Sequence, residues 1–285
     1  MSHKGLIAHL LIIAALVGGG SGAHAFDDAR YPDLKGQWVR GYPGLARFDP
    51  AKGLGPKQEA PLTPEYQAIY QANLAEQAKG GQGIDPTYRC LPPGMPRVMH
   101  VYSPMEIVAT PDTTYMLIEH IHDSRRIYTD GRDWPDNMYD DPQFSGYSIG
   151  RWVDADPAGR YTALEVETRG IKNPHTYDQT GIPFHADGRA IIRERLFLDQ
   201  ANPNTLYDAI TVIDNALTRP WSALKTYRRL AAKGPIWWRE DVCAENNVHV
   251  AVGKEEYFLS ADGLLMPARK DQAPPDLRYF KQSAK

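Results

Sequence analysis

The segments AIIRERLFL (residues 190–198) and LYDAITVI (residues 206–213) decide the fold of this chain. In both segments, apolar side chains recur at alternate positions, which is typical of a β-strand with one buried face. Asn202-Pro203-Asn204, a turn-forming sequence, separates them. A connection this short favours strands that run antiparallel to each other.

The same two-residue period recurs along the middle of the chain. It predicts further strands at Met105–Ala109, Tyr115–His122, Arg126–Thr129, Ser148–Val153, Tyr161–Thr168 and Ser222–Arg229. No helical pattern lies between them, which argues against a parallel α/β sheet. We therefore expect a mainly β fold: an antiparallel barrel-like structure, of which a lipocalin-like barrel is one form, or a sandwich.

The remaining segments suggest how the chain is divided. One N-terminal helix is predicted after Thr63, with Pro64 at its first position and Gly80-Gly81 at its end. We assign residues 26–89 to an N-terminal arm and this helix, with long wrapping segments, and residues 90–253 to the β domain. Residues 254–285, which include Pro274-Pro275, are expected to form a loosely attached tail.

The first 25 residues have the parts of a secretory signal peptide. Lys4 supplies a basic start, Leu6–Val17 is apolar, and Ala23-His24-Ala25 is a small-x-small cleavage site. The apolar run is too short to span a bilayer as a mature helix. We expect cleavage after Ala25 and a periplasmic or secreted protein with no integral membrane segment.

Charge and cysteine content limit the classes of partner and predict the state of the cysteines. The formal net charge of −3, without a basic cluster, argues against a nucleic-acid partner or a membrane surface. Cys90 and Cys243 are the two cysteines of the chain. In an oxidising compartment they most simply form a disulfide, the alternative being two buried free thiols. The oligomeric state is left open.

Two carboxylates interrupt apolar stripes. Glu194 shares a strand face with Ile192 and Leu196, and Glu119 shares one with Tyr115 and Leu117. If these faces point inward, each carboxylate is desolvated and needs a partner or a proton. Arginines close in sequence could pair with them: Arg125, Arg126, Arg132, Arg193 and Arg195. The pattern indicates either a structural ion-pair network or a ligand site in an apolar cavity.

The ligand-site interpretation gives the first functional hypothesis, a small, largely apolar or cyclic molecule bound by the barrel. Chemistry there would need no cofactor, with Glu194 or Glu119 as acid or base and His122 or His185 as proton partner. The expected ligand contacts come from basic and aromatic side chains: Arg125, Arg132, Arg195, Tyr128 and Trp152.

Two other functions remain open. One is a noncatalytic binding or assembly protein of the cell envelope. The other is a metal-dependent hydrolase, because His120 and His122 alternate onto one face of a predicted strand and could supply two ligands. A serine hydrolase is disfavoured, since Gly146-Tyr147-Ser148-Ile149-Gly150 leads into a strand and not into the helix that a nucleophile elbow requires.

Several short elements also occur together as a set. They are Glu119–Arg132, Gly146–Trp152, Leu164–Thr168, Glu194-Arg195, Thr218-Arg219-Pro220-Trp221 and Cys243-Ala244-Glu245-Asn246. As a set they resemble a large group of uncharacterised exported bacterial proteins with E-x-x-H, D-G-R, G-x-S-x-G-x-W, V-[DE]-T and T-R-P-W elements. The resemblance implies export and adds Asp130 to the candidate site, beside Glu119, His122, Arg132 and Glu194.

Overall fold

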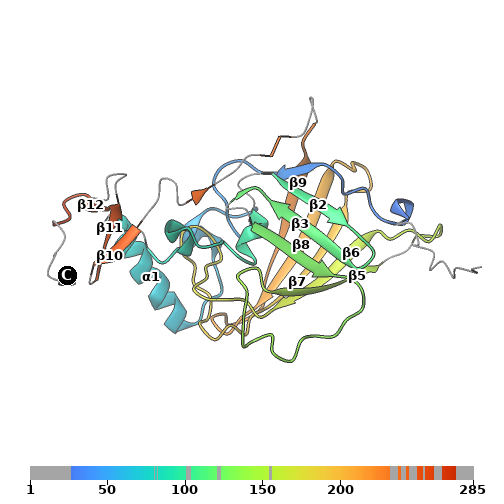
Figure 1. The fold of residues 1–285 in the computed structure, drawn as a ribbon. Coiled ribbons are helices and arrows are strands. Elements are labelled where there is room, and N and C mark those ends of the chain that lie inside the picture. The colour runs from blue at the N-terminus through green and yellow to red at the C-terminus, as the bar shows by residue number, and fades with distance from the viewer. Residues whose placement is uncertain are drawn as a thin grey trace, which may run out of the picture.

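The barrel form of the predicted fold is confirmed. The computed structural model describes residues 27–79, 81, 83–100, 104–120, 123–153, 156–231, 237–238, 242–243, 249–252, 254–259 and 265–273. Nine strands form a closed barrel in sequence order (Figure 1). Their bounds are β1 (Gln37–Arg40), β2 (Met105–Ala109), β3 (Thr113–Ile118), β4 (Asp123–Tyr128), β5 (Tyr147–Val153), β6 (Ala163–Arg169), β7 (Ile191–Leu198), β8 (Thr205–Ile213) and β9 (Trp221–Arg229).

All neighbouring strands of the barrel are antiparallel except β4 and β5. These two run parallel, with Ile127 opposite Ser148 and Tyr128 opposite Ile149. A closed ring of nine strands cannot alternate direction at every step, because nine is odd. Residues 129–146 therefore carry the chain from one end of the barrel back to the other, which the expected all-antiparallel order did not include.

The first strand lies in the segment that the sequence assigns to the N-terminal arm. β1 pairs with β2 on one side and with β9 on the other, and so closes the barrel. Trp38 of this strand is fully buried, and its Nε1 donates to the Leu34 carbonyl oxygen at 2.9 Å. The residues before β1, 27–36, are called the arm below.

One α-helix, α1 (Pro64–Ala78), occurs among the described residues and lies at one end of the barrel (Figure 1). It begins as predicted, because the Thr63 side chain accepts from the Tyr66 backbone N–H at 3.4 Å and Pro64 is its first residue. The Asn73 side chain ties α1 to the loop before β7, donating to the Thr180 carbonyl oxygen at 2.7 Å. Four 3₁₀ turns lie wholly within the described residues: η1 (Asp28–Arg30), η2 (Gly55–Gln58), η3 (Pro86–Arg89) and η4 (Arg97–His100).

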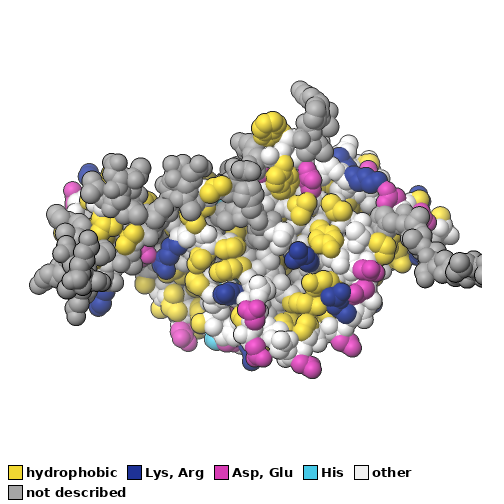
Figure 2. All heavy atoms as spheres, in the orientation of Figure 1, with side chains coloured by type: hydrophobic (Ala, Val, Ile, Leu, Met, Phe, Trp, Pro, Cys, Tyr) yellow, Lys and Arg dark blue, Asp and Glu magenta, His cyan; other side chains and the backbone are white. Residues whose placement is uncertain are grey.

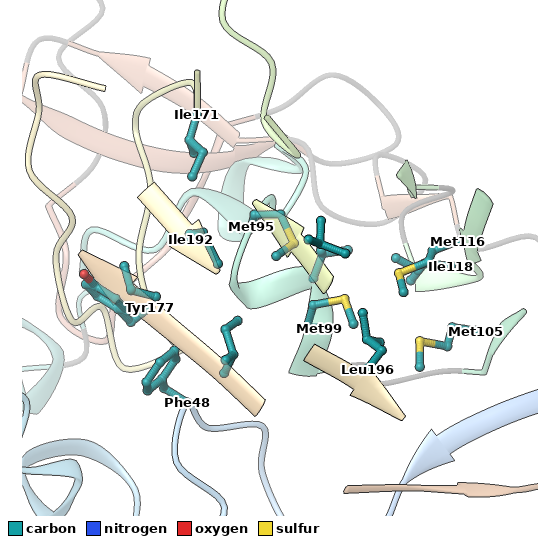
Figure 3. Packing of buried hydrophobic residues seen from close by; sticks show 14 of the residues in the cluster. Phe48, Met95, Met99, Met105, Met116, Ile118, Ile171, Tyr177, Ile192 and Leu196 are labelled. Carbon is teal, nitrogen blue, oxygen red and sulfur yellow. The ribbon is translucent and has the colours of Figure 1, made fainter. Parts of the chain in front are cut away.

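The barrel interior, or lumen, is filled by the protein itself. Figure 3 shows Met95 and Met99 packed with inward-facing side chains such as Met116 of β3 and Leu196 of β7. All four of these side chains are at most 3% exposed. The Tyr227 hydroxyl of β9 donates to the Met99 carbonyl oxygen at 2.6 Å. The segment that contains η4 thus forms part of the core.

The inward face of β3 differs from the one expected. Met116 and Ile118 are buried, whereas Leu117, which was placed on the inner face with Glu119, is 36% exposed. Both faces of this strand carry apolar residues, so the two-residue period alone did not distinguish them. On β7 the expected inner face, with Ile192, Glu194 and Leu196, is the buried one.

Beyond the barrel, three strands form a small antiparallel sheet in the C-terminal part of the chain. They are β10 (His249–Val252), β11 (Glu255–Leu259) and β12 (Leu265–Pro267). The predicted disulfide between Cys90 and Cys243 is confirmed, with the two Cα atoms 5.4 Å apart. None of the helices in the described ranges has the length and apolar character needed to cross a bilayer. On the face shown in Figure 2, basic and acidic side chains are intermixed.

Candidate functional site

Two of the candidates from the sequence, Glu194 and Arg125, meet inside the lumen. The Arg125 guanidinium from β4 donates to both carboxylate oxygens of Glu194 on β7, with Nη1 to Oε1 at 2.8 Å and Nη2 to Oε2. Their side chains are 1% and 0% exposed. A bidentate pair of this kind satisfies both charges in an interior where either one alone would be costly.

Two hydroxyl groups also accept from Arg125. Its Nε donates to Ser148 Oγ at 3.2 Å, and its Nη2 donates to Thr168 Oγ1 at 2.8 Å. Ser148 is the serine of the G-x-S-x-G sequence, and it lies on β5, fully buried, 2.8 Å from Thr168. Its hydroxyl therefore serves the arginine, in agreement with the expectation that this sequence is not a nucleophile elbow.

A second pair of ionisable side chains in the lumen was not predicted from the sequence. Asp208 of β8 and Lys225 of β9 occupy directly opposed positions, and they are 0% and 1% exposed. Burial raises the pKa of the Asp208 carboxyl well above its usual range, and the nearby Glu194 adds to this shift. Burial lowers the pKa of the Lys225 ammonium to about 8.

The signal for this second pair was present in the sequence. Asp208 alternates with Leu206 and Ile210, which is the same pattern of a carboxylate within an apolar stripe that identified Glu194. Lys225 alternates in the same way with Ala223 and Tyr227. Applying the criterion to every strand would have found both residues.

Three other candidates lie together on the outside of the barrel. Asp130 and Arg132 form a salt bridge at 2.6 Å, which lowers the pKa of the Asp130 carboxyl. The Arg132 guanidinium lies 3.8 Å from the centre of the Tyr128 ring, and that ring is 4.9 Å from Tyr147. The D-G-R sequence thus forms a compact cation–π cluster at the end of β4, separate from the lumen pair.

The remaining acid–base candidates are dispersed. Glu119 is buried just after β3, where its backbone N–H donates to the Pro104 carbonyl oxygen at 3.2 Å. His185 lies beside α1, with its ring 5.2 Å from Tyr66 and its Nδ1 2.9 Å from the Asp187 carboxylate. His122 falls outside the described residues, so its expected pairing with Glu119 or with His120 has no structural account here.

The arrangement of the described residues does not support a metal site. Within those ranges no group of three or more His, Cys, Asp or Glu side chains is placed to hold an ion. His120, one of the two histidines proposed as ligands, is half-buried directly after β3 and Glu119.

Two grooves lie on the outer surface near β7, and Arg195 lines both. The larger, called the arm groove, has a volume of about 860 Å³ and lies between the arm and the ends of β7 and β8. Four aromatic rings line it: Tyr31, Tyr161, Phe197 and Tyr207. The smaller, of about 550 Å³, crosses β5 to β8 and is lined by Trp134 and by an alternation of arginine and glutamate side chains.

The aromatic rings of the arm groove are held in pairs. The ring centres of Tyr31 and Tyr161 are 5.3 Å apart. Those of Phe197 on β7 and Tyr207 on β8 are 5.4 Å apart. The predicted ligand contact Trp152 supports the first pair, with its ring 5.2 Å from Tyr31. The arm is fixed to the barrel by the Tyr161 backbone N–H, which donates to the Arg30 carbonyl oxygen at 2.7 Å.

Polar side chains line the arm groove as well. Arg195 donates to Glu165 at 2.8 Å, and Arg160 pairs with Asp156 at 2.6 Å. The Tyr207 hydroxyl donates to Asp199 at 3.0 Å. Aromatic walls with a few convergent polar groups are the usual lining of a small-molecule site.

Comparison with known proteins assigns no family to this chain. No protein-family model matches it, and no curated protein matches it either.

Proposed function

We propose that this chain is an exported β-barrel protein that binds a small cyclic molecule in the arm groove. The observation that carries the proposal is the set of four aromatic rings lining a groove of about 860 Å³. This volume lies within the range of roughly 300–1,000 Å³ that is usual for small-molecule sites. Flat rings in the ligand would stack on or meet the edges of these side chains.

The polar groups of the groove narrow the kind of ligand. Arg160 and Arg195 can donate to ligand oxygens, and Gln200 can both donate and accept. Asp33, 70% exposed at its side chain, can accept from ligand hydroxyl groups. A cyclic molecule that carries oxygen substituents satisfies both the rings and these groups.

The binding function is preferred over acid–base catalysis by Glu194. Its carboxylate is fully buried, and both oxygens accept from Arg125. An ion-paired carboxylate inside a filled lumen offers a substrate neither access nor a free oxygen. These observations support a structural role for the Arg125–Glu194 pair. We therefore place the proposed binding site on the outer surface.

Export is part of the proposal because of the signal-like first 25 residues and the disulfide. Disulfides form and persist mainly in oxidising compartments such as the bacterial periplasm. Sequencing the amino terminus of exported material tests this part, and we expect it to begin at Phe26.

Identification of retained small molecules tests the binding site. Mature protein is purified from its native compartment, denatured, and the released compounds are analysed by mass spectrometry. Phe197→Ala removes one groove ring, and Tyr115→Ala removes a half-buried outer ring on β3 that does not line the groove. We expect a cyclic compound from the parent and from Tyr115→Ala, with at least tenfold less from Phe197→Ala. Equal retention by the two variants would contradict the assignment.

A further inference from the structure

Asp208 and Lys225 are placed unusually for two charged residues. They are directly opposed on the antiparallel strands β8 and β9, and both point into the closed lumen. Directly opposed residues have Cβ atoms about 4.5–5.5 Å apart, which the flexible lysine stem can span. Neither Asp208 oxygen has a hydrogen-bond partner among the described residues. The Lys225 Nζ donates at 2.7 Å to a neutral acceptor, the Phe48 carbonyl oxygen.

Burial disfavours the charged form of both groups. With its pKa raised well above the usual range, Asp208 favours the neutral carboxylic acid. With a pKa of about 8, Lys225 has a substantial fraction of neutral amine near that pH. A neutral amine is a nucleophile, and a neutral carboxylic acid is an acceptor that such an amine can attack.

Buried side chains surround these two groups. Side chains that exclude water from the lumen include Phe48, whose ring centre lies 4.8 Å from Lys225 Nζ, and Tyr227, which is 1% exposed. Arg125 is engaged with Glu194, so it is not the partner of Asp208.

We infer that Asp208 and Lys225 are joined by an intramolecular amide bond between Asp208 Cγ and Lys225 Nζ. The reaction needs only the two side chains. Nζ attacks Cγ, the C–N bond forms, and the bond from Cγ to its hydroxyl oxygen breaks. One proton from Nζ passes to the departing hydroxyl, so that a single water molecule leaves and no oxidant or reductant takes part. Rotation about the lysine side-chain bonds releases Nζ from Phe48 and brings it to Cγ.

Glu194 acts on Asp208 through its charge. It faces the lumen from β7, the other neighbour of β8, where Leu196 is directly opposite Asp208 and Glu194 is directly opposite Ile210. Its electrostatic interaction with Asp208 favours the protonated acid. Glu194 takes no part in the new bond, which joins only β8 and β9.

Intact mass spectrometry of the mature protein, reduced and denatured, tests the inference directly. We expect a mass lower by one water than the mass calculated from the sequence for most of the molecules. Proteolysis should then yield a branched peptide in which a β8 fragment is joined through Lys225 to a β9 fragment. An unmodified parent mass, or a loss of water that maps to another residue, would overturn the inference.

Two variants distinguish this amide bond from other reactions that remove one water molecule. Lys225→Arg keeps a positive side chain but cannot form the amide, so its mass should equal its own calculated mass. Lys172→Arg, an exposed lysine outside the lumen, should retain the loss of one water. If Lys225→Arg does not fold, the branched peptide of the parent decides the question without it. Binding in the arm groove does not depend on this bond, so the two proposals fail separately.

Discussion

Replacing Glu194 with glutamine removes the charge that balances Arg125 and keeps the shape of the side chain. In the parent, both guanidinium nitrogens Nη1 and Nη2 donate to the Glu194 carboxylate, and both side chains are at most 1% exposed. Removing one partner of such a buried pair costs about 3–5 kcal/mol, because the other charge is left in the interior. Ser148 and Thr168 remain as acceptors for Arg125, but neither carries a charge.

Thermal unfolding, followed by circular dichroism, measures this cost. For a domain of this size, each kcal/mol lowers the Tm by roughly 2–4 °C, so the expected fall is about 6–20 °C. Glu165→Gln is the matched control, because Glu165 is 37% exposed and pairs with Arg151 on the outer surface. It should change the free energy of unfolding by less than about 1 kcal/mol.

A double variant separates the charge from the packing. Arg125→Met together with Glu194→Met removes both charges, and it should recover most of the stability that Glu194→Gln loses. A Tm for Glu194→Gln within about 2 °C of the parent would refute the structural role of the pair. Glu194 would then return as a candidate for a functional carboxylate.

Two further predictions concern the end of the barrel near α1. Burial lowers the pKa of His175 from 6.5 to about 3, so the stability it contributes is present above pH 6.5 and is lost as the pH falls towards 3. Denaturant unfolding should show a loss of roughly 3 kcal/mol between pH 7 and pH 4 that His175→Gln removes, and an unchanged profile in that variant would contradict it. Gly94 has a φ of +59°, and an added Cβ would clash with His175 and Phe144, so Gly94→Ala should cost more than about 3 kcal/mol. Gly159→Ala, at φ +77° with open space around it, should cost only about 1–2 kcal/mol, and equal losses in denaturant unfolding would contradict the clash.

The barrel could be predicted because most of its strands show a clear alternation. The expected strand at Met105–Ala109 agrees with β2 at both ends, and that at Ala190–Leu198 differs from β7 by one residue. β1 was missed because a strand of four residues is too short to show the two-residue period clearly. The region around it is also rich in glycine and proline. The parallel pairing of β4 with β5 depends on closure of the whole ring, which no local pattern encodes.

The candidate residues show the same division between local and tertiary information. Glu194 was identified correctly as a buried carboxylate, and its partner Arg125 was among the arginines proposed for it. Which of those arginines pairs with Glu194 depends on the contact between β4 and β7 across the lumen. The arm groove was not predicted, because Tyr31 and Phe197 are far apart in sequence and meet only when the arm lies along the barrel.

Closure of the barrel through β1 and β9 has a consequence for how a growing chain folds. Trp38 of β1 pairs with Arg229 of β9. During synthesis, one edge of β1 therefore stays unpaired until β9, the last strand of the barrel, has been made. Until then, both β1 and β8 present unpaired backbone groups to any neighbouring chain. A product truncated before Trp221 would keep these two edges permanently, and we expect it to aggregate where the complete chain folds.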